Sequence, residues 1–144
     1  MKIIILDYGA GNTKSVQFSL QRLGYEGILS YNFDEIISAD RIIFPGVGHA
    51  SSAMNRLHER SLDILIPKLE QPVLGICLGM QLLCNHTEEG NTKGLGVFDV
   101  DVKRFLNEVK VPQIGWNTIS NLKSNLFNGI KDNDYMYLVH SYYA

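Results

Sequence analysis

Short apolar runs recur along the first half of this chain, and each run is followed by a polar or glycine-rich stretch. Residues 2–6 and 41–44 are mostly Ile and Leu, a composition typical of strands buried on both faces of a parallel sheet. Residues 25–29 form a second strand candidate, and Val73, Leu74 and Ile76 form a fourth, bounded by Pro72. The pattern therefore predicts several short strands in the first 76 residues.

Helical spacing fills the intervals between these runs. Residues 14–23 place Val16, Leu20 and Leu23 on one face, with Asn12 or Thr13 as the cap and Gly24 at the end. Residues 34–38 read as a short helix. Residues 50–70 read as a longer helix, broken near Pro67.

Strands that alternate with helices at this spacing predict βαβ units. We therefore expect an α/β fold with an open, mostly parallel sheet and helices on both faces. Ligands of such sheets bind outside the carboxyl ends of the strands. Residues 45–48 and Cys77 both follow strands, so they are expected to meet at that edge. The turn with Gly9 and Gly11 is expected only to reverse the chain, because Lys14 stands where a dinucleotide fingerprint has its third glycine.

The second half of the chain has a different texture. Residues 86–96 form a polar, glycine-rich loop, and residues 97–105 alternate well enough for a strand. Residues 111–117 look rich in turns, and residues 121–130 show little periodicity. The aromatic run 135–143 predicts a strand. No linker is evident, so residues 1–144 are expected to form one domain.

The sequence Gly75-Ile-Cys77-Leu-Gly79 lies between the last predicted strand and a run of helix formers. A nucleophile flanked two residues away by glycines is the pattern of a strained strand-to-helix elbow, in which larger neighbours would collide. The following helix would offer N–H groups to the sulfur and favour its thiolate. We therefore interpret Cys77 as a nucleophile rather than as a small buried apolar residue.

The composition narrows the class of function. The chain has 144 residues, a net charge of −2 and 45% hydrophobic content, so neither nucleic acid nor a membrane surface is expected as a partner. Only two cysteines are present, and Cys84 is read as structural, facing the core from the helix that carries Cys77. A cytoplasmic protein is expected, because no apolar run resembles a signal peptide or a membrane span. No metal or other cofactor is expected.

Cysteine chemistry on an amide needs oxyanion donors and a base. The Leu78 N–H is the natural first donor, and the loop Pro45–Gly48 can supply the second. The candidate bases are the four histidines of the chain, His49, His58, His86 and His140. Of these, His140 is the best placed, on a predicted strand late in the chain.

Together these motifs resemble the class I, triad-type glutamine amidotransferases. The resemblance rests on residues 75–81 and 45–48, joined by 6–12, 115–117 and 139–142, and it follows the whole chain in order. Within the family, the set is most similar to glutaminase subunits that serve a (β/α)8-barrel cyclase in histidine biosynthesis. The resemblance implies a flavodoxin-like amidotransferase domain.

The resemblance also implies roles for individual residues. Cys77 would attack the glutamine amide to form a thioester, and the ammonia released would pass to the cyclase partner of a heterodimer. The oxyanion site would consist of Gly46, Val47 and Leu78, and the glutamine head group would be held by Gln81, Glu89 and backbone at Ser141 and Tyr142. Trp116 would lie near the partner. The alternatives are a solvated Gln81, a loop charge at Glu89 and a core role for Trp116.

One motif of the family is not found here. The family's catalytic His and Glu lie in a His-Pro-Glu motif, and His140 matches a different family position. We therefore expect an amidotransferase domain that lacks its C-terminal part and is poorly active. Two alternatives are a catalytically inactive module that keeps the partner surface and a related subunit that feeds ammonia to another barrel synthase, for example in sugar or surface polysaccharide amidation. A cysteine hydrolase acting on another amide is a third.

Overall fold

The computed structural model describes residues 1–106, 108 and 110–144. It contains two compact units, the first made of residues 1–103 with Ala144 and the second of residues 104–143. Within the described residues, no helix has the length and apolar character that crossing a membrane requires.

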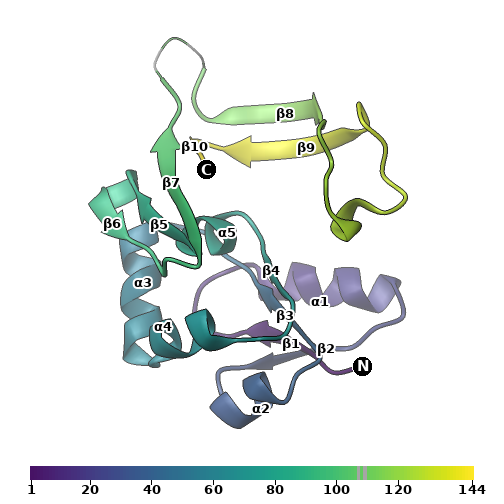
Figure 1. Cartoon of the computed structure of the whole chain (residues 1–144), viewed down its shortest axis with the longest axis vertical. Helices are drawn as coiled ribbons and strands as arrows, with labels where there is room; N and C mark the ends of the chain where they lie inside the picture. The colour runs from purple at the N-terminus through teal and green to yellow at the C-terminus, as the bar shows by residue number, and fades with distance from the viewer. Residues whose placement is uncertain (107, 109) are drawn as a thin grey trace. The chain divides into compact units, whose positions relative to one another are not determined.

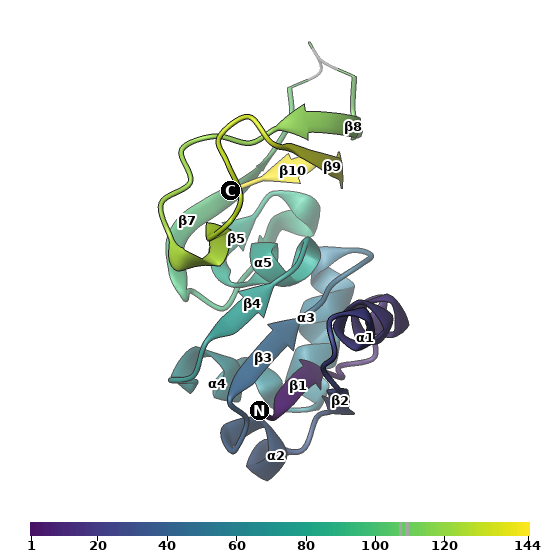
Figure 2. The same cartoon turned by 90° about the vertical axis from the view of Figure 1, so that its right-hand side faces the viewer.

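The first unit is organised around a parallel sheet with the strand order β2-β1-β3-β4 (Figures 1 and 2). Its strands are β1 (Ile3–Leu6), β2 (Gly27–Ser30), β3 (Arg41–Phe44) and β4 (Val73–Gly75). All four residues of β1 are buried, as a continuous apolar run predicts. The predicted α/β fold and parallel sheet are confirmed, with β2 beginning two residues later than expected.

Helices cover both faces of this sheet. They are α1 (Thr13–Arg22), α2 (Phe33–Ile37), α3 (Ala50–Glu59), α4 (Leu62–Leu65) with the 3-10 turn η1 (Ile66–Lys68), and α5 (Leu78–Leu82). Val16 and Leu20 of α1 pack against Ile5 and its neighbours on one face. The larger core on the other face includes Phe44 of β3 and Leu57 of α3. The predicted cap Asn12 accepts a hydrogen bond from the Ser15 N–H at 3.3 Å.

The long helix expected over residues 50–70 is interrupted earlier than predicted. Helix α3 ends at Glu59, and Ser61 adopts a left-handed backbone with φ of 54° before α4 begins. Pro67 lies inside η1, where the fixed φ of proline fits the first turn of a helix. The prediction of a break at Pro67 was therefore wrong, because the turn at Arg60 and Ser61 already ends α3.

A smaller sheet follows α5 in the same unit. Strand β5 (Cys84–Thr87) pairs antiparallel with β6 (Thr92–Lys93) and parallel with β7 (Phe98–Arg104), and the turn η2 (Glu89–Asn91) joins β5 to β6. Strand β7 confirms the predicted strand at 97–105. Cys84 begins β5 instead of continuing the helix, and much of the predicted loop 86–96 is structured, so both predictions were wrong.

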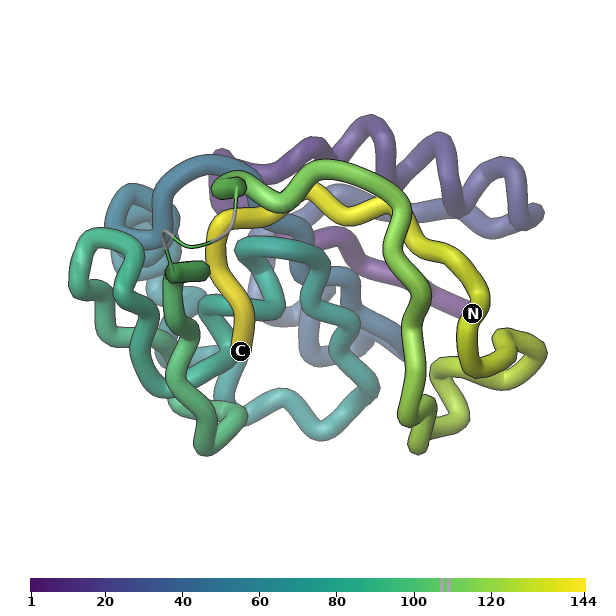
Figure 3. Tube along the Cα trace, turned by 90° about the horizontal axis from the view of Figure 1, so that it is seen from above, coloured from purple at the N-terminus to yellow at the C-terminus, as the bar shows by residue number. Residues whose placement is uncertain are grey.

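The second unit contains an antiparallel ribbon of two strands. Strands β8 (Gln113–Thr118) and β9 (Tyr135–His140) run side by side (Figure 3), and the turn η3 (Asn125–Phe127) and strand β10 (Tyr142–Tyr143) complete the elements. The segment 111–117 was predicted as turns, yet most of it is strand, because pairing with β9 overrides its glycine and asparagine. The strand predicted at 135–143 is interrupted at Ser141.

Candidate active site

Cys77 lies at the junction between β4 and α5, where the chain turns from strand to helix. Its backbone has φ of 53° and ψ of −117°, a conformation that costs a non-glycine residue about 1–3 kcal/mol. Cys77 is exposed, and the side chain is a free thiol. The strained elbow expected from the sequence is confirmed, and its strain presents the thiol to solvent.

The glycines on either side of Cys77 are needed for close packing. A Cβ added to Gly79 would lie 1.9 Å from the carbonyl oxygen of Phe44, and one added to Gly75 would lie 2.6 Å from the Cα of Met80. Neither distance can be accommodated without moving backbone. The elbow therefore depends on glycine because helix α5 begins directly against the end of β3.

The loop Pro45–Gly48 follows β3 and meets the start of α5. A Cβ on Gly46 would lie 2.4 Å from the Gly79 nitrogen and 2.8 Å from Leu78 atoms, so Gly46 packs against the residue that follows Cys77. Gly48 has φ of 102°, and Val47 is 53% exposed. The expected meeting of the loop with the elbow is confirmed. At the first position of α5, the Leu78 N–H has no partner within the helix, as an oxyanion donor requires.

Tyr8 lies beneath this loop and was not singled out from the sequence. It is 1% exposed, its hydroxyl donates to the Pro45 carbonyl at 2.7 Å, and its ring meets the edge of Phe44 at 5.4 Å. Burial raises the pKa of its phenol above the ordinary value; the positive charge of Arg56 opposes that rise, and Cys77 adds to it. The hydroxyl therefore stays protonated, and remains a donor, at neutral pH.

Gln81 lies one helical turn after Cys77 on α5. It is only 6% exposed, and its Oε1 is buried without a hydrogen-bond partner among the described residues. The alternative of a solvated Gln81 was wrong. An unsatisfied buried carbonyl costs about 1–3 kcal/mol, so this oxygen is well suited to accept a hydrogen bond from a ligand.

Glu89 holds the start of helix α3. Its Oε2 accepts a hydrogen bond from the Ala50 N–H at 2.8 Å, whereas the N-cap residue His49 makes no side-chain cap. A carboxylate at this position also complements the positive end of the helix dipole. The alternative of an unattached loop charge was therefore wrong, and the second carboxylate oxygen is the part of Glu89 that a ligand could use.

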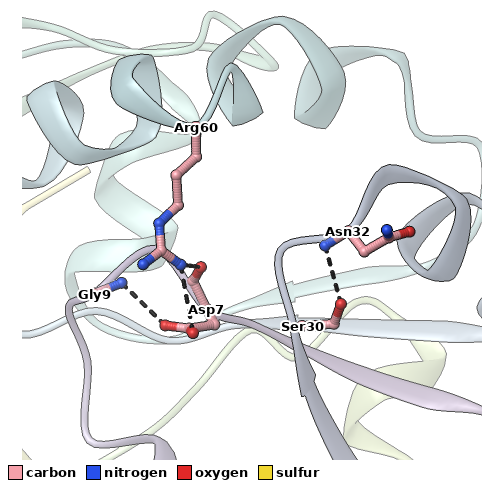
Figure 4. Close-up of polar contacts among 5 residues, drawn as sticks. All are labelled: Asp7, Gly9, Ser30, Asn32 and Arg60. Carbon is pink, nitrogen blue, oxygen red and sulfur yellow. Dashed lines mark hydrogen bonds and ion pairs between the residues drawn. The ribbon is translucent and has the colours of Figure 1, made fainter.

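The turn after β1 is fixed by a network around Asp7 (Figure 4). The Asp7 carboxylate accepts from the Gly9 N–H at 3.1 Å and pairs with Arg60 at 3.4 Å, and Arg60 also donates to the Asp7 carbonyl. The Arg60 guanidinium lies 4.4 Å from the ring centre of Tyr31. In the adjoining strand end, the Asn32 N–H donates to Ser30 Oγ at 3.0 Å. These contacts give Asp7 a structural role that the sequence did not reveal.

A cavity of about 330 Å³ opens beside this turn and the oxyanion loop. It lies at the carboxyl ends of β1 and β3, between which the order of the strands reverses, the usual ligand position in such sheets. Its lining is Gly9, Ala10, Gly11, Val47, Gly48, His49, Ser52, Ala53 and Arg56. The turn after β1 thus does more than reverse the chain, because it forms one wall of a cavity at the edge that carries Val47.

Cys84 differs from Cys77 in exposure, because Cys84 is buried and Cys77 is exposed. It is 1% exposed and its Sγ lies 3.7 Å from the Met80 carbonyl oxygen. Burial, and secondarily the negative charge of Asp101, raise the pKa of its thiol. A buried, protonated thiol is a poor nucleophile, so the structural reading of Cys84 agrees with its surroundings.

Each of the four histidines is hydrogen-bonded to a group other than Cys77. Each contact is made by a ring nitrogen at 2.8–2.9 Å: His49 contacts Ser51 Oγ, His58 contacts Asp63 Oδ2, His86 contacts Asn91 Oδ1, and His140 contacts the Tyr142 carbonyl oxygen. These contacts assign none of them the role of base. No group of three or more potential metal ligands occurs among the described residues.

Three predicted site residues belong to the second unit and are described within it. The Ser141 carbonyl accepts from the Phe105 N–H at 3.0 Å, and Tyr142 begins β10. Trp116 on β8 is 68% exposed and meets the edge of the Tyr137 ring at 5.5 Å. The core alternative for Trp116 was wrong. The roles predicted for these three residues stay predictions.

Comparison with known proteins gives consistent matches. The family model of class-I glutamine amidotransferases matches residues 4–144. Over 147 residues the chain is 52% identical to "Imidazole glycerol phosphate synthase subunit HisH" of Bacteroides fragilis (strain YCH46), covering 100% of this chain and 75% of that protein. The protein of the same name from Pectobacterium atrosepticum is 46% identical, with 99% and 74% covered. The chain thus spans about three quarters of these relatives.

A solved structure supports the fold independently. A crystal structure of a glutamine amidotransferase superposes with a TM-score of 0.63 at 18% identity, covering 81% of this chain and 62% of that chain. At this identity the likeness concerns the fold alone.

Proposed function

The chain belongs to the class-I glutamine amidotransferase family, and we propose that it is the glutaminase subunit of imidazole glycerol phosphate synthase, an enzyme of histidine biosynthesis. The observation that carries the proposal is the elbow, where a strained, exposed Cys77 lies next to Leu78, against which Gly46 packs. Relatives that are 51–52% identical to this chain are named as the HisH subunit of imidazole glycerol phosphate synthase. We further propose that residues 1–144 belong to one amidotransferase domain of which the two compact units are parts.

The proposed reaction proceeds in two steps. The Cys77 sulfur bonds to the carboxamide carbon of glutamine, the C–N bond breaks, and the nitrogen takes up the proton that the thiol gives up and leaves as ammonia. Water then adds to the resulting γ-glutamyl thioester, the C–S bond breaks, and glutamate leaves as the thiol is restored. In both steps the carbonyl oxygen becomes negative and is stabilised by N–H groups of Leu78 and of Gly46 or Val47.

The head group of glutamine carries an ammonium group, which needs hydrogen-bond acceptors, and a carboxylate, which needs hydrogen-bond donors. Gln81 Oε1 is buried without a partner in the described part of the chain and can accept from an ammonium group, and the carboxylate of Glu89 can do the same. We propose that backbone groups at Ser141 and Tyr142 complete the pocket. No cofactor is needed for this chemistry, because the nucleophile and the oxyanion donors are all protein groups.

We also propose a cytoplasmic heterodimer with a (β/α)8-barrel cyclase. That partner would use the ammonia, delivered through a channel, to make imidazole glycerol phosphate and the aminoimidazole carboxamide nucleotide AICAR. Trp116 is proposed to lie at the contact with the partner. In support, β8 and β9 expose Trp116 and Tyr137 next to one another, flanked by Ile114 and Val139.

Covalent labelling tests the substrate of the site. A chloroketone analogue of glutamine should alkylate Cys77 and leave Cys84 unmodified, as peptide mass spectrometry would show. Glutamine should slow this labelling, whereas asparagine at the same concentration should not. Equal labelling of both cysteines, or labelling that glutamine does not slow, would contradict a glutamine pocket around Cys77.

Trp116 offers a direct test of the partner surface. It is the only tryptophan of the chain, so its fluorescence reports on one position. Titration with the cyclase should shift its emission, and Trp116→Ala should weaken the complex at least tenfold, because central aromatic residues dominate many interfaces. Val100→Ala, at an exposed position of β7, is the control. Unchanged affinity of the Trp116 variant would exclude Trp116 from the interface.

A further inference from the structure

The loop that carries the proposed oxyanion donors is held at its first residue by the turn after β1. Gly11 touches the Pro45 ring, since a Cβ on Gly11 would lie 3.2 Å from the Pro45 Cβ and Cγ. On its buried side, the Pro45 carbonyl accepts the Tyr8 hydroxyl at 2.7 Å. Both contacts join segments more than thirty residues apart in sequence.

The planar Pro45–Gly46 peptide links the hydrogen bond at the Pro45 carbonyl to the direction of the Gly46 N–H. The pyrrolidine ring fixes φ of Pro45, so the plane of the Pro45–Gly46 peptide is set by ψ of Pro45 alone. Among the described residues the only cis peptide bond precedes Pro112, so the Pro45–Gly46 peptide bond is trans. In a trans peptide the C=O and N–H point in opposite directions. Holding the Pro45 oxygen on the Tyr8 side therefore directs the Gly46 N–H to the other side.

The position of Gly46 makes this direction relevant to the reaction. Gly46 packs against Leu78 and Gly79, the first two residues of α5, and Leu78 follows the nucleophile. The Tyr8 hydroxyl reaches the same loop, because it donates to the Pro45 carbonyl at 2.7 Å. The hydroxyl, the Pro45–Gly46 peptide and the elbow therefore lie within one packed region of the first unit.

We propose that Tyr8 is a positioning residue for the oxyanion site, whose hydroxyl fixes the Pro45–Gly46 peptide so that the Gly46 N–H is oriented for the anion formed at Cys77. This inference rests on the proposed function. Tyr8 does not touch the substrate and acts only through Pro45. Because the phenol stays protonated at neutral pH, the constraint holds throughout the physiological range.

Tyr8→Phe is the decisive variant, because it keeps the ring and its contact with Phe44 and removes only the donor. Two reactions of Cys77 separate positioning from nucleophilicity. Iodoacetamide alkylates the thiol by displacing iodide and develops no oxyanion. In the nitrile analogue of glutamine, the thiolate adds to the nitrile carbon, the π electrons move to nitrogen, and solvent supplies a proton to give a thioimidate.

Removal of one oxyanion donor typically costs 10²–10³ in rate, and loss of its orientation should cost about ten- to a hundredfold. Tyr8→Phe should therefore slow thioimidate formation by about that factor and change the iodoacetamide rate less than about twofold. Tyr25→Phe, at an exposed tyrosine, is the control for both reactions. An unchanged ratio of the two rates in Tyr8→Phe would overturn the proposal.

A second readout needs no chemistry at Cys77. The amide resonance of Gly46 in a ¹⁵N–¹H spectrum should broaden or split in Tyr8→Phe, because the freed peptide samples two orientations, and it should be unchanged in Tyr25→Phe. If wild-type protein alkylates with iodoacetamide but not with the nitrile, the proposed function fails, and the Gly46 resonance alone decides the role of Tyr8. An identical Gly46 resonance in wild type and Tyr8→Phe would then overturn it.

Discussion

The two compact units bury their residues in very different ways. In the first unit, β1 is buried along its whole length, and cores on both faces of the parallel sheet hold helices α1 and α3. In the second unit, none of the described residues between 104 and 143 is buried, and the strands β8 and β9 alternate between exposed and half-buried positions. The nucleophile and the proposed oxyanion loop lie on the unit that has its own core.

This difference indicates where rigidity comes from. A strained backbone at Cys77 persists only if its surroundings hold it, and the first unit supplies close packing around Gly75 and Gly79. A two-stranded ribbon by itself is marginally stable in water. We therefore expect substitutions in the first unit to change stability and chemistry together, and those in the second unit to change mainly binding.

The largest contrast is expected for aliphatic truncations. Leu57→Ala empties a fully buried position of α3 and should lower the free energy of unfolding by about 2–5 kcal/mol. Val139→Ala, on the exposed side of β9, should change it by less than about 0.5 kcal/mol. Urea denaturation of both variants measures the difference. Equal losses of unfolding free energy in the two variants would contradict the difference in burial between the two units.

Two glycine substitutions, one in each unit, test the close packing at the elbow. Gly79→Ala places a Cβ 1.9 Å from the Phe44 oxygen and should cost about 3 kcal/mol, the upper end for overpacking. It should also change the alkylation rate of Cys77. Gly129→Ala has open space around it and should cost about 1 kcal/mol through its positive φ alone. Wild-type Cys77 reactivity in Gly79→Ala would contradict close packing at the elbow.

The cap on α3 should have a smaller effect. Glu89→Ala removes the acceptor of the Ala50 N–H and should cost about 1 kcal/mol, as loss of a helix cap usually does. Glu70→Ala, at an exposed position, is the matched control and should be nearly neutral. Thermal unfolding at neutral pH measures both. A Glu89 variant as stable as the Glu70 variant would show that the cap contributes nothing.

Alkaline pH provides the mildest test of burial in the first unit. The pKa values of Tyr8 and Cys84 are both raised in the folded state, so the unfolded chain loses these protons first as pH rises. Their contribution to stability is complete below about pH 8.5 and declines above it, first through the thiol and from about pH 10 through the phenol. Cys84→Ser should remove the first part of the decline and Tyr8→Phe the second. Unfolding curves whose pH dependence is the same in all three proteins would contradict these assignments.

The sequence predicted the features that depend on local pattern. Continuous apolar runs identified the strands of the parallel sheet, and the glycines at 75 and 79 identified the elbow at Cys77. Both succeed because burial on two faces and a strained turn each restrict the residue types directly. Strand β5 was missed because Asn85, His86 and Thr87 carry no apolar alternation, and strand β8 because its pairing with β9 outweighs its turn-forming residues.

The contacts that shape the site could not be read from the sequence. Tyr8 reaches Pro45, Arg60 reaches Asp7 and Glu89 reaches Ala50 across 37, 53 and 39 positions, respectively. Such pairs are set by the arrangement of elements in space, and no local spacing indicates them. Gln81 illustrates the same limit. Its helical position was clear, but the sequence did not show that its Oε1 is buried with no hydrogen-bond partner among the residues that the structure describes.

The most direct test of the central claim is the release of ammonia and glutamate from glutamine, measured together for this chain mixed with the cyclase and its nucleotide ligand. The elbow mechanism predicts the two products in equal amounts, at the low rate expected of a chain without the family's His-Pro-Glu motif. That rate should fall to background in Cys77→Ala and persist in Cys84→Ser. Ammonia release that stands above the background without protein and is the same in wild type and Cys77→Ala would contradict it.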